Sequence, residues 1–379
     1  MTRHTPPMFA LSDTAAVTLI GFATGAVLGL AARIPRFCTL GAIEDALYGG
    51  NRDRIMMWPM AIGVAVAATA VLAALGWATI ENSAFFRFEF SLSASIIGGL
   101  MFGIGMALAG NCGFGALARV GGGDIRSVLI VLVIGIAAYM AAVGPLAELR
   151  TTLFPRTEAA HPGSGSIAGF IAEHTSISAL YVALALAVLL IAPALTDPHF
   201  ISNRSAVIWS VLIGLSCSAA WWGTSYVAHT GFEHVPVESH SFTMPLGEIV
   251  LQVMGVGGHF GGFSVGSVSG VLSGALLGAR IRKQFHWEAC DDPGELRRQI
   301  FGAVLMGFGG VIALGCSVGQ GLSAFSVLAW SAPVTAASIS VGAIVGLRYL
   351  VEGSRMTDAL LLPFQTLLAL FRRGPRSRS

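Results

Sequence analysis

Long apolar runs alternate with short polar segments along almost the whole chain. Most of these runs reach the roughly 20 residues that an α-helix needs to cross about 30 Å of hydrocarbon. None shows the ten-residue alternation of apolar and polar positions that is typical of a membrane β-barrel. The pattern therefore predicts an all-α, polytopic membrane protein of about nine spans, at 15–34, 55–79, 98–117, 125–146, 178–195, 205–228, 246–281, 300–314 and 327–351. The glycine-rich stretch 254–262 is expected to break the seventh of these spans.

Composition supports the membrane assignment. Charged residues make up 11% of the 379 residues, against about 25% in an ordinary soluble protein. The mean hydropathy is +0.75. The first residues lead into a full-length apolar run without a small-residue cleavage site, so we expect no cleaved signal peptide and a first span that stays in the bilayer.

Arginine and lysine gather in alternate loops. Because cytoplasmic loops carry an excess of these residues, nine spans with a periplasmic N-terminus and a cytoplasmic C-terminus fit the pattern. The apolar run from Leu360 to Leu370 allows a tenth short span or an interfacial helix. The predicted cytoplasmic cations are Arg33, Arg36, Arg52, Arg54, Arg119, Arg126, Arg204, Arg280, Arg282, Lys283, Arg297, Arg298, Arg372, Arg373, Arg376 and Arg378.

Two distant segments look like copies of one another. Residues 98–117 read GGLMFGIGMALAGNCGFGAL and residues 302–321 read GAVLMGFGGVIALGCSVGQG. With nine spans the two copies run in opposite directions, which predicts an inverted repeat of the kind found in transporters. We expect one membrane domain over 1–379, with repeats at 15–147 and 205–351. A linking segment at 148–204 carries the fifth span, and a cytoplasmic tail covers 352–379.

Each copy places a cysteine, Cys112 or Cys316, where an apolar helix gives way to a glycine-rich stretch. Such a stretch predicts a broken, re-entrant helix, which at membrane depth must be covered by protein or line a cavity. The freed N–H groups and the positive end of the following half-helix favour an anion. Close helix packing and helix capping are the ordinary alternatives. The candidate substrate contacts beside the cysteines are Asn111, Gly113, Gly115, Ser317, Gly319 and Gln320.

The apolar spans carry almost no charge at their centres, so the site has to use neutral groups. A thiol combines a weak S–H donor with a soft, polarizable sulfur, which suits a sulfur-bearing anion better than a hard oxyanion. Cys217 lies inside an apolar span and is predicted to be a small core residue, and Cys290 is predicted to be an ordinary loop residue. Cys38 lies among charged residues just after the first span.

The segments RFCTLGAIEDAL, GGLMFGIGMALAGNCGFGALARVGGGD and FGAVLMGFGGVIALGCSVGQGLSAFS resemble the signature elements of the YeeE/YedE family of bacterial inner-membrane sulfur-compound transporters. The resemblance implies thiosulfate uptake through an hourglass-shaped monomer whose re-entrant half-helices meet near the centre. It also implies a substrate path with Cys38 at its cytoplasmic end and with Cys112 and Cys316 at its constriction. A cytoplasmic sulfur-carrier protein is a candidate partner.

Two other classes compete with a sulfur-anion permease. A transition-metal permease is suggested by His229, His234, His240 and His259 together with the cysteines. Their spacing matches no compact ligand motif, so a solvated loop is the preferred explanation. A membrane-bound thiol redox enzyme would need a CxxC, a nucleotide fingerprint or a haem-attachment motif, and the sequence has none. We therefore expect a non-enzymatic transporter without a cofactor, a metal ion or a nucleic-acid partner.

Overall fold

The computed structural model describes residues 12–155, 166–175, 177–233, 235–255, 261–288 and 292–353. These residues are almost entirely helical, and no strand longer than an isolated bridge occurs among them. The long helices are α1 (Asp13–Arg33), α3 (Asp53–Ala74), α5 (Leu92–Ala109), α7 (Ile125–Ala142), α10 (Ala179–Leu195), α12 (Arg204–Thr230), α14 (Phe263–Ile281), α15 (Pro293–Ile312) and α16 (Ser331–Glu352). The prediction of an all-helical fold is confirmed.

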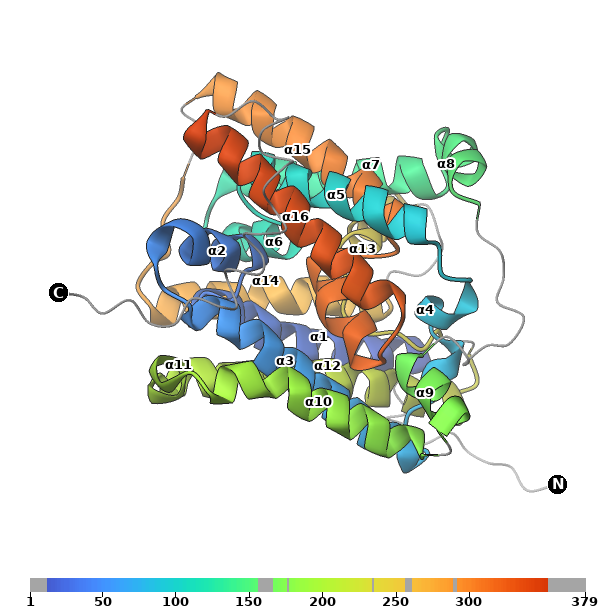
Figure 1. The fold of residues 1–379 in the computed structure, drawn as a ribbon. Coiled ribbons are helices and arrows are strands. Elements are labelled where there is room, and N and C mark those ends of the chain that lie inside the picture. Colours follow the sequence, from blue (N-terminus) through green and yellow to red (C-terminus); the bar gives the residue numbers. More distant parts are fainter. Residues whose placement is uncertain are drawn as a thin grey trace.

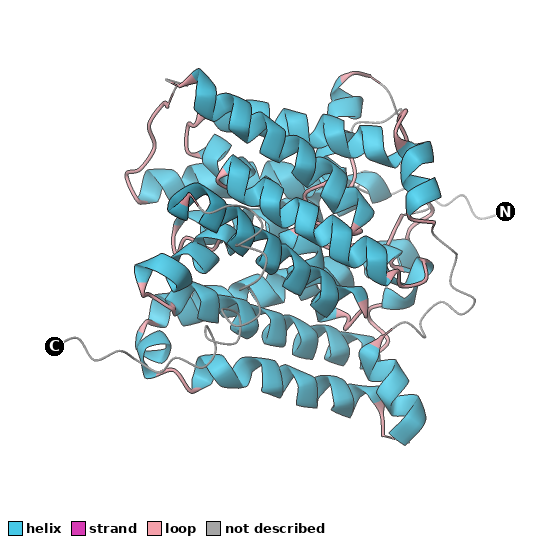
Figure 2. Ribbon diagram, turned by 45° about the horizontal axis from the view of Figure 1, so that its top comes forward, coloured by secondary structure: helices cyan, strands magenta, loops and turns pink. Residues whose placement is uncertain are grey.

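Shorter helices lie between and beside the long ones (Figures 1 and 2). They are α2 (Thr39–Glu44), α4 (Ala84–Arg87), α6 (Gly113–Gly121), α8 (Ala147–Leu153), α9 (Ile167–Thr175), α11 (Pro198–Ser202) and α13 (Met244–Val253), with the π-helices η1 (Asp45–Gly49) and η3 (Gly319–Ala324) and the 3-10 turn η2 (Ile80–Asn82). In Figure 1, α5, α7, α15 and α16 form an upper layer, and α1, α3, α10 and α12 form a lower one. The short helices α2, α6 and α13 lie between the two layers.

Side-chain caps mark where several long helices begin. The Ser91 hydroxyl accepts a hydrogen bond from the N–H of Ala94, and the Asp124 carboxylate accepts from Arg126 and Ser127. Asn203 caps α12 in the same way. Since a capping oxygen satisfies N–H groups that the helix itself cannot pair, these residues set the starts of α5, α7 and α12.

Seven helical segments of the described chain are long and apolar enough to cross a membrane. They are α1, α3, α5 continued through α6, α7, α12, α14 and α16. The chain is thus a multi-pass membrane protein, while the count of nine spans stays a prediction. The break expected in the seventh span, 246–281, is confirmed, because one helix ends at Val253 and a new one begins at Phe263. Glycine-rich sequence separates the two helices, and glycine in a helix interior is costly. The run from Leu360 to Leu370 and the tail lie outside the described residues.

The two copies of the duplicated sequence pack against each other through glycine. A methyl carbon placed on Gly98 would lie 2.8 Å from the carbonyl oxygen of Gly309. One placed on Gly302 would lie 2.6 Å from the carbonyl oxygen of Gly105. Residues 98 and 302 correspond in the two copies, as do 105 and 309, so one contact is repeated with its partners exchanged. The order of these contacts makes α5 and α15 antiparallel.

The contacts that α5 and α15 make with a second pair of helices, α16 and α7, repeat in the same way. A carbon placed on Gly103 of α5 would overlap the Ile339 carbonyl oxygen of α16, and one on Gly307 of α15 would lie 2.8 Å from the Ile134 carbonyl oxygen of α7. Matched contacts of this kind are those expected when two halves are related by a two-fold rotation. We retain the inverted repeat, with halves at 15–147 and 205–351, as our proposal for the domain organisation.

Candidate functional site

Both duplicated helices break at the same position. Helix α5 ends at Gly110, whose φ of 76° is left-handed, and α15 ends before Leu314, whose φ is 59°. Glycine adopts this conformation without strain, whereas leucine rarely does. Because Leu314 occupies the place of Gly110 in the second copy, a similar backbone turn is present in both halves. The cysteine follows two residues later in each.

The cysteine sulfur caps the helix that follows each break. The N–H of Gly115 donates to Cys112 Sγ at 3.4 Å, and the N–H of Gly319 donates to Cys316 Sγ at 3.3 Å. Cys112 precedes α6, and Cys316 precedes a helical segment over 317–326 that contains η3. Both side chains are 1% exposed. Each thiol is thus fixed at the positive end of a half-helix inside the protein.

Cys38 lies next to Cys112. After α1 the chain turns back into the molecule, and Cys38 becomes the N-cap residue of α2. A carbon placed on Gly115 would lie 3.8 Å from both Cys38 Sγ and Cys112 Sγ, so the two thiols lie on the same side of α6 at its first turn. The resemblance placed Cys38 at the cytoplasmic end of a path; the structure brings its sulfur against the central cysteine of the first half.

The two breaks meet through their own residues. Ser317, directly after Cys316, lies against the Cys112 thiol. The N–H of Phe242 donates to Cys316 Sγ at 3.3 Å, while a carbon placed on Gly113 would lie 3.1 Å from the carbonyl oxygen of Phe242. Cys112 and Cys316 therefore belong to one central cluster.

Two of the predicted contact residues carry polar atoms that lack a protein partner. Asn111 Oδ1 and Ser317 Oγ are buried, and neither makes a well-formed hydrogen bond within the described residues. An unpaired buried polar atom costs about 1–3 kcal/mol. Gln320 differs, because its amide donates to the carbonyls of Ala313 and Leu314 and its oxygen accepts from Ser331. Gln320 closes the end of α15, and Gly113, Gly115 and Gly319 begin the half-helices.

One part of the site was missed by sequence reasoning. Residues 239–243 form an irregular segment before α13, in which Ser239, His240, Phe242 and Thr243 are buried. The interpretation of His240 as part of a solvated loop is wrong, because its side chain is 0% exposed. His229 lies at the end of α12 with its ring near Thr79, and His234 and His259 lie outside the described residues.

The sequence does contain a signal for this segment, which is the constant offset between the two copies of the duplicated sequence. Thr243 stands 204 positions after Thr39, the offset that relates Cys316 to Cys112. The hydroxyls of both threonines are buried without a partner in the described chain. Phe242 thus takes the place that Cys38 has in the first half.

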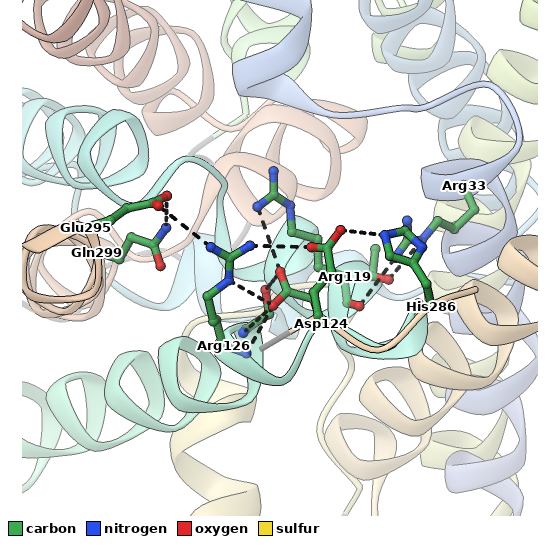
Figure 3. A network of polar contacts seen from close by, with 10 residues as sticks. Arg33, Arg119, Asp124, Arg126, His286, Glu295 and Gln299 are labelled. Carbon is green, nitrogen blue, oxygen red and sulfur yellow. Dashed lines mark hydrogen bonds and ion pairs between the residues drawn. The ribbon is translucent and has the colours of Figure 1, made fainter. Parts of the chain in front are cut away.

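Arginine-bearing segments from different parts of the sequence meet in one network of polar contacts (Figure 3), where several long helices begin or end. Arg33 at the end of α1 donates to the carbonyl of Ala118 at the end of α6 (3.0 Å). Arg126 at the start of α7 lies 3.4 Å from Glu288 and 3.7 Å from Glu295, near the start of α15. These segments were all predicted to face the same side of the membrane, and their contacts agree with that prediction.

No group of three histidine, cysteine or acidic side chains suited to a metal ion occurs in the part of the chain that the structure describes. Cys217 is buried, as predicted, among the hydroxyls of Ser239, Ser323 and Ser326. Cys290 lies outside the described residues.

Comparison with known families identifies the kind of protein that carries this cluster. A family model described as sulphur transport matches residues 35–345, which include both cysteine-bearing breaks, the segment 239–243 and Cys38. The chain belongs to the sulphur transport family. The resemblance to YeeE/YedE proteins is thereby confirmed, and so is the expectation of a transporter rather than an enzyme.

Two thiosulfate transporters align with most of the chain. The thiosulfate transporter TsuA of Escherichia coli (strain K12) is 26% identical over 340 residues, which cover 82% of this chain and 88% of that protein. The thiosulfate transporter TsuA of Spirochaeta thermophila (strain ATCC 700085 / DSM 6578 / Z-1203) is 24% identical over 328 residues, covering 82% and 92%. The alignments extend well beyond the cysteine motifs.

Proposed function

We propose that the protein is a bacterial inner-membrane permease for thiosulfate, or for a closely related anion that carries a terminal sulfur. The observation that carries the proposal is the central cluster of Cys38, Cys112 and Cys316. In this cluster two thiols cap half-helices from opposite halves, and the hydroxyl of Ser317 has no hydrogen-bond partner among the described residues. The names of the two curated relatives supply thiosulfate as the substrate to test.

The chemistry of the cluster fits such an anion. Thiosulfate has a soft sulfur at one end and charged oxygens at the other. Thiols offer polarizable contact and weak S–H donation to the sulfur. The positive ends of α6 and of the segment 317–326 attract the charge without placing a lysine or arginine in the membrane interior. An anion that accepts a hydrogen bond from Ser317 would also remove the cost of leaving that hydroxyl unpaired.

We also propose how the protein is oriented in the membrane. The end that carries Arg33, Arg119 and Arg126 faces the cytoplasm, because positive charge is retained there. The N-terminus is then periplasmic and the C-terminus cytoplasmic. A cytoplasmic sulfur-carrier protein is the recipient that we propose on this side.

Uptake of radiolabelled thiosulfate into cells that produce this chain, but lack their own thiosulfate uptake, tests the function. The unaltered chain should take up the label, and Cys112→Ala and Cys316→Ala should abolish uptake at equal abundance in the membrane. Cys217→Ala is the matched control, since this cysteine is equally buried but lies among serine hydroxyls. Normal uptake by either central variant would contradict the cysteine path, and no uptake by the unaltered chain would contradict the substrate.

A further inference from the structure

His240 combines complete burial with an unpaired ring nitrogen. Its Nδ1 lies 2.8 Å from the hydroxyl of Ser267, whereas its Nε2 is buried without a partner among the described residues. The ring lies parallel to Phe242, with centroids 6.2 Å apart, and rests 5.3 Å from the ring of Phe263. A buried ring nitrogen without a partner among the described residues points to a partner from outside them, such as a bound anion.

The backbone joins His240 to the thiol cluster. Its carbonyl oxygen accepts from the hydroxyl of Ser323, 2.7 Å away, in the half-helix that Cys316 caps. Two residues further on, Phe242 donates its N–H to Cys316 Sγ. The ring of Phe242 also lies 5.3 Å from that of Phe114, two residues after Cys112. His240 is therefore fixed to the same elements that position the central cysteines.

His240 and Cys38 lie beside different parts of α1. His240 contacts Phe263 and Ser267 in the first turns of α14, which pack beside the middle of α1 at Gly21 and Gly25. Cys38 follows the last residues of α1. An anion that moves between the two ends of α1 would thus encounter the imidazole and Cys38 at successive positions.

The hydrogen bond with Ser267 indicates which ring nitrogen of His240 carries the proton. The imidazole is the only hydrogen-bond partner of the Ser267 hydroxyl among the described residues, whereas Ser269 bonds back to the carbonyls of its own helix. If Ser267 donates to Nδ1, its proton is used and Nε2 carries the hydrogen. If Nδ1 donates instead, the serine hydrogen remains unpaired. The first arrangement leaves fewer unpaired groups and presents an N–H donor.

We infer that His240 is a substrate-contact residue that donates its Nε2–H to an oxygen of the transported anion beside Cys316. This inference rests on the proposed function and adds an oxygen-recognising group to the thiols, which recognise sulfur. A neutral N–H donor binds an anion without the cost of burying a fixed charge.

Two substitutions separate the two nitrogens of the ring. The amide of asparagine can replace Nδ1 and keep the contact with Ser267, but it does not reach the position of Nε2. The amide of glutamine can place an N–H near Nε2. Initial rates of radiolabelled thiosulfate uptake should show a KM raised about tenfold or more for His240→Asn, as for a lost hydrogen bond to a charged group. His240→Gln should stay within a few-fold of the unaltered chain.

The maximal rate per molecule in the membrane should change less than KM in both variants, which a general packing defect would not produce. Ser267→Ala provides a second test that keeps the imidazole, and it should raise KM by less than His240→Asn does because the tautomer is no longer fixed. His229→Asn is the control, since this ring lies at the end of α12 beside Thr79. It should leave KM unchanged.

Equal KM values for His240→Asn and His240→Gln would overturn the inference, whether both match the unaltered chain or both rise together. The proposed function would survive that result as long as the unaltered chain takes up thiosulfate. Absence of uptake by the unaltered chain would instead contradict the proposed function, and the assignment of His240 with it.

Discussion

The backbone N–H of Phe242 donates to Cys316 Sγ at the same distance, 3.3 Å, as the N–H of Gly319 in the helix that the cysteine caps. Two donors on one sulfur occupy its acceptor sites, so the S–H proton is left to point elsewhere. Cys112 receives one such bond, from Gly115. The two thiols are related by the duplication but differ in how firmly their sulfur is held.

This arrangement makes Cys316→Ser informative. A serine hydroxyl is a good helix cap and the stronger donor, so the variant should fold and reach the membrane. We expect thiosulfate uptake to be lost as completely as in Cys316→Ala, because a hydroxyl lacks the polarizability of sulfur. Uptake per molecule in the membrane is the measurement, with Cys217→Ser as the control that should remain active. An active Cys316→Ser would show that hydrogen bonding alone suffices at this position.

The glycine contact between α5 and α15 predicts a loss of stability. In Gly302→Ala the added methyl would lie 2.6 Å from the Gly105 carbonyl and 2.7 Å from the Ala109 nitrogen, so the helices must separate. Overpacking of this kind costs about 1–3 kcal/mol, and the thermal unfolding midpoint of the purified protein should fall by several degrees. Gly49→Ala, whose methyl would find its nearest neighbour at 3.6 Å, is the matched control and should not lower it. Equal midpoints would contradict the close contact.

Accessibility from the two sides of the membrane tests the orientation. Phe232, after α12, and Trp287, before α15, are both exposed, whereas Ser239 in the first of these loops is buried. In a background without reactive native cysteines, Phe232→Cys should react with an impermeant maleimide added to intact spheroplasts. Trp287→Cys should react only after the membrane is opened, because its loop lies at the arginine-rich end. Reaction of both from the same side would rule out the proposed topology.

The contact between α3 and α11 predicts a pH-dependent contribution to stability. His199 Nδ1 lies 2.7 Å from Asp53 Oδ1, and this carboxylate raises the pKa of His199 above its ordinary value of 6.5. The stabilisation is therefore fully present below pH 6.5 and is lost as the pH rises through the higher pKa of the folded state. The unfolding midpoint of His199→Gln should differ from that of the unaltered protein at pH 6 and approach it at pH 9. His174→Gln, which loses a bond to a carbonyl rather than to a carboxylate, should show no such convergence.

The sequence alone predicted the structure where a residue type has one strong structural consequence inside the membrane. Long apolar runs have to be helices, since every backbone group must be paired within the segment. Glycine beside cysteine in both copies predicted the breaks at Gly110 and Leu314. The glycine-rich stretch 254–262 likewise predicted the interruption between α13 and α14.

His240 could not be predicted, because its role depends on a fold rather than on a local pattern. In the sequence it belongs to a polar stretch that reads as a solvated loop. Burial comes from the return of residues 239–243 between α14 and the half-helix after Cys316, a contact between distant parts of the chain. Only the shared register of Thr39 and Thr243 hinted that this stretch matches the Cys38 segment.

The meeting of Gly98 with Gly309, and of Gly302 with Gly105, limits how the two copies can diverge. A clash between two side chains can be relieved by shortening the partner, but a glycine facing backbone has nothing left to shorten. A larger residue at any of these positions thus has no compensating change across the contact, and each copy restricts mutation in the other. The two copies are free to differ in sequence away from the contact between α5 and α15. Cys38 and Phe242 are an example, since one half carries a thiol and the other a phenyl ring at corresponding positions.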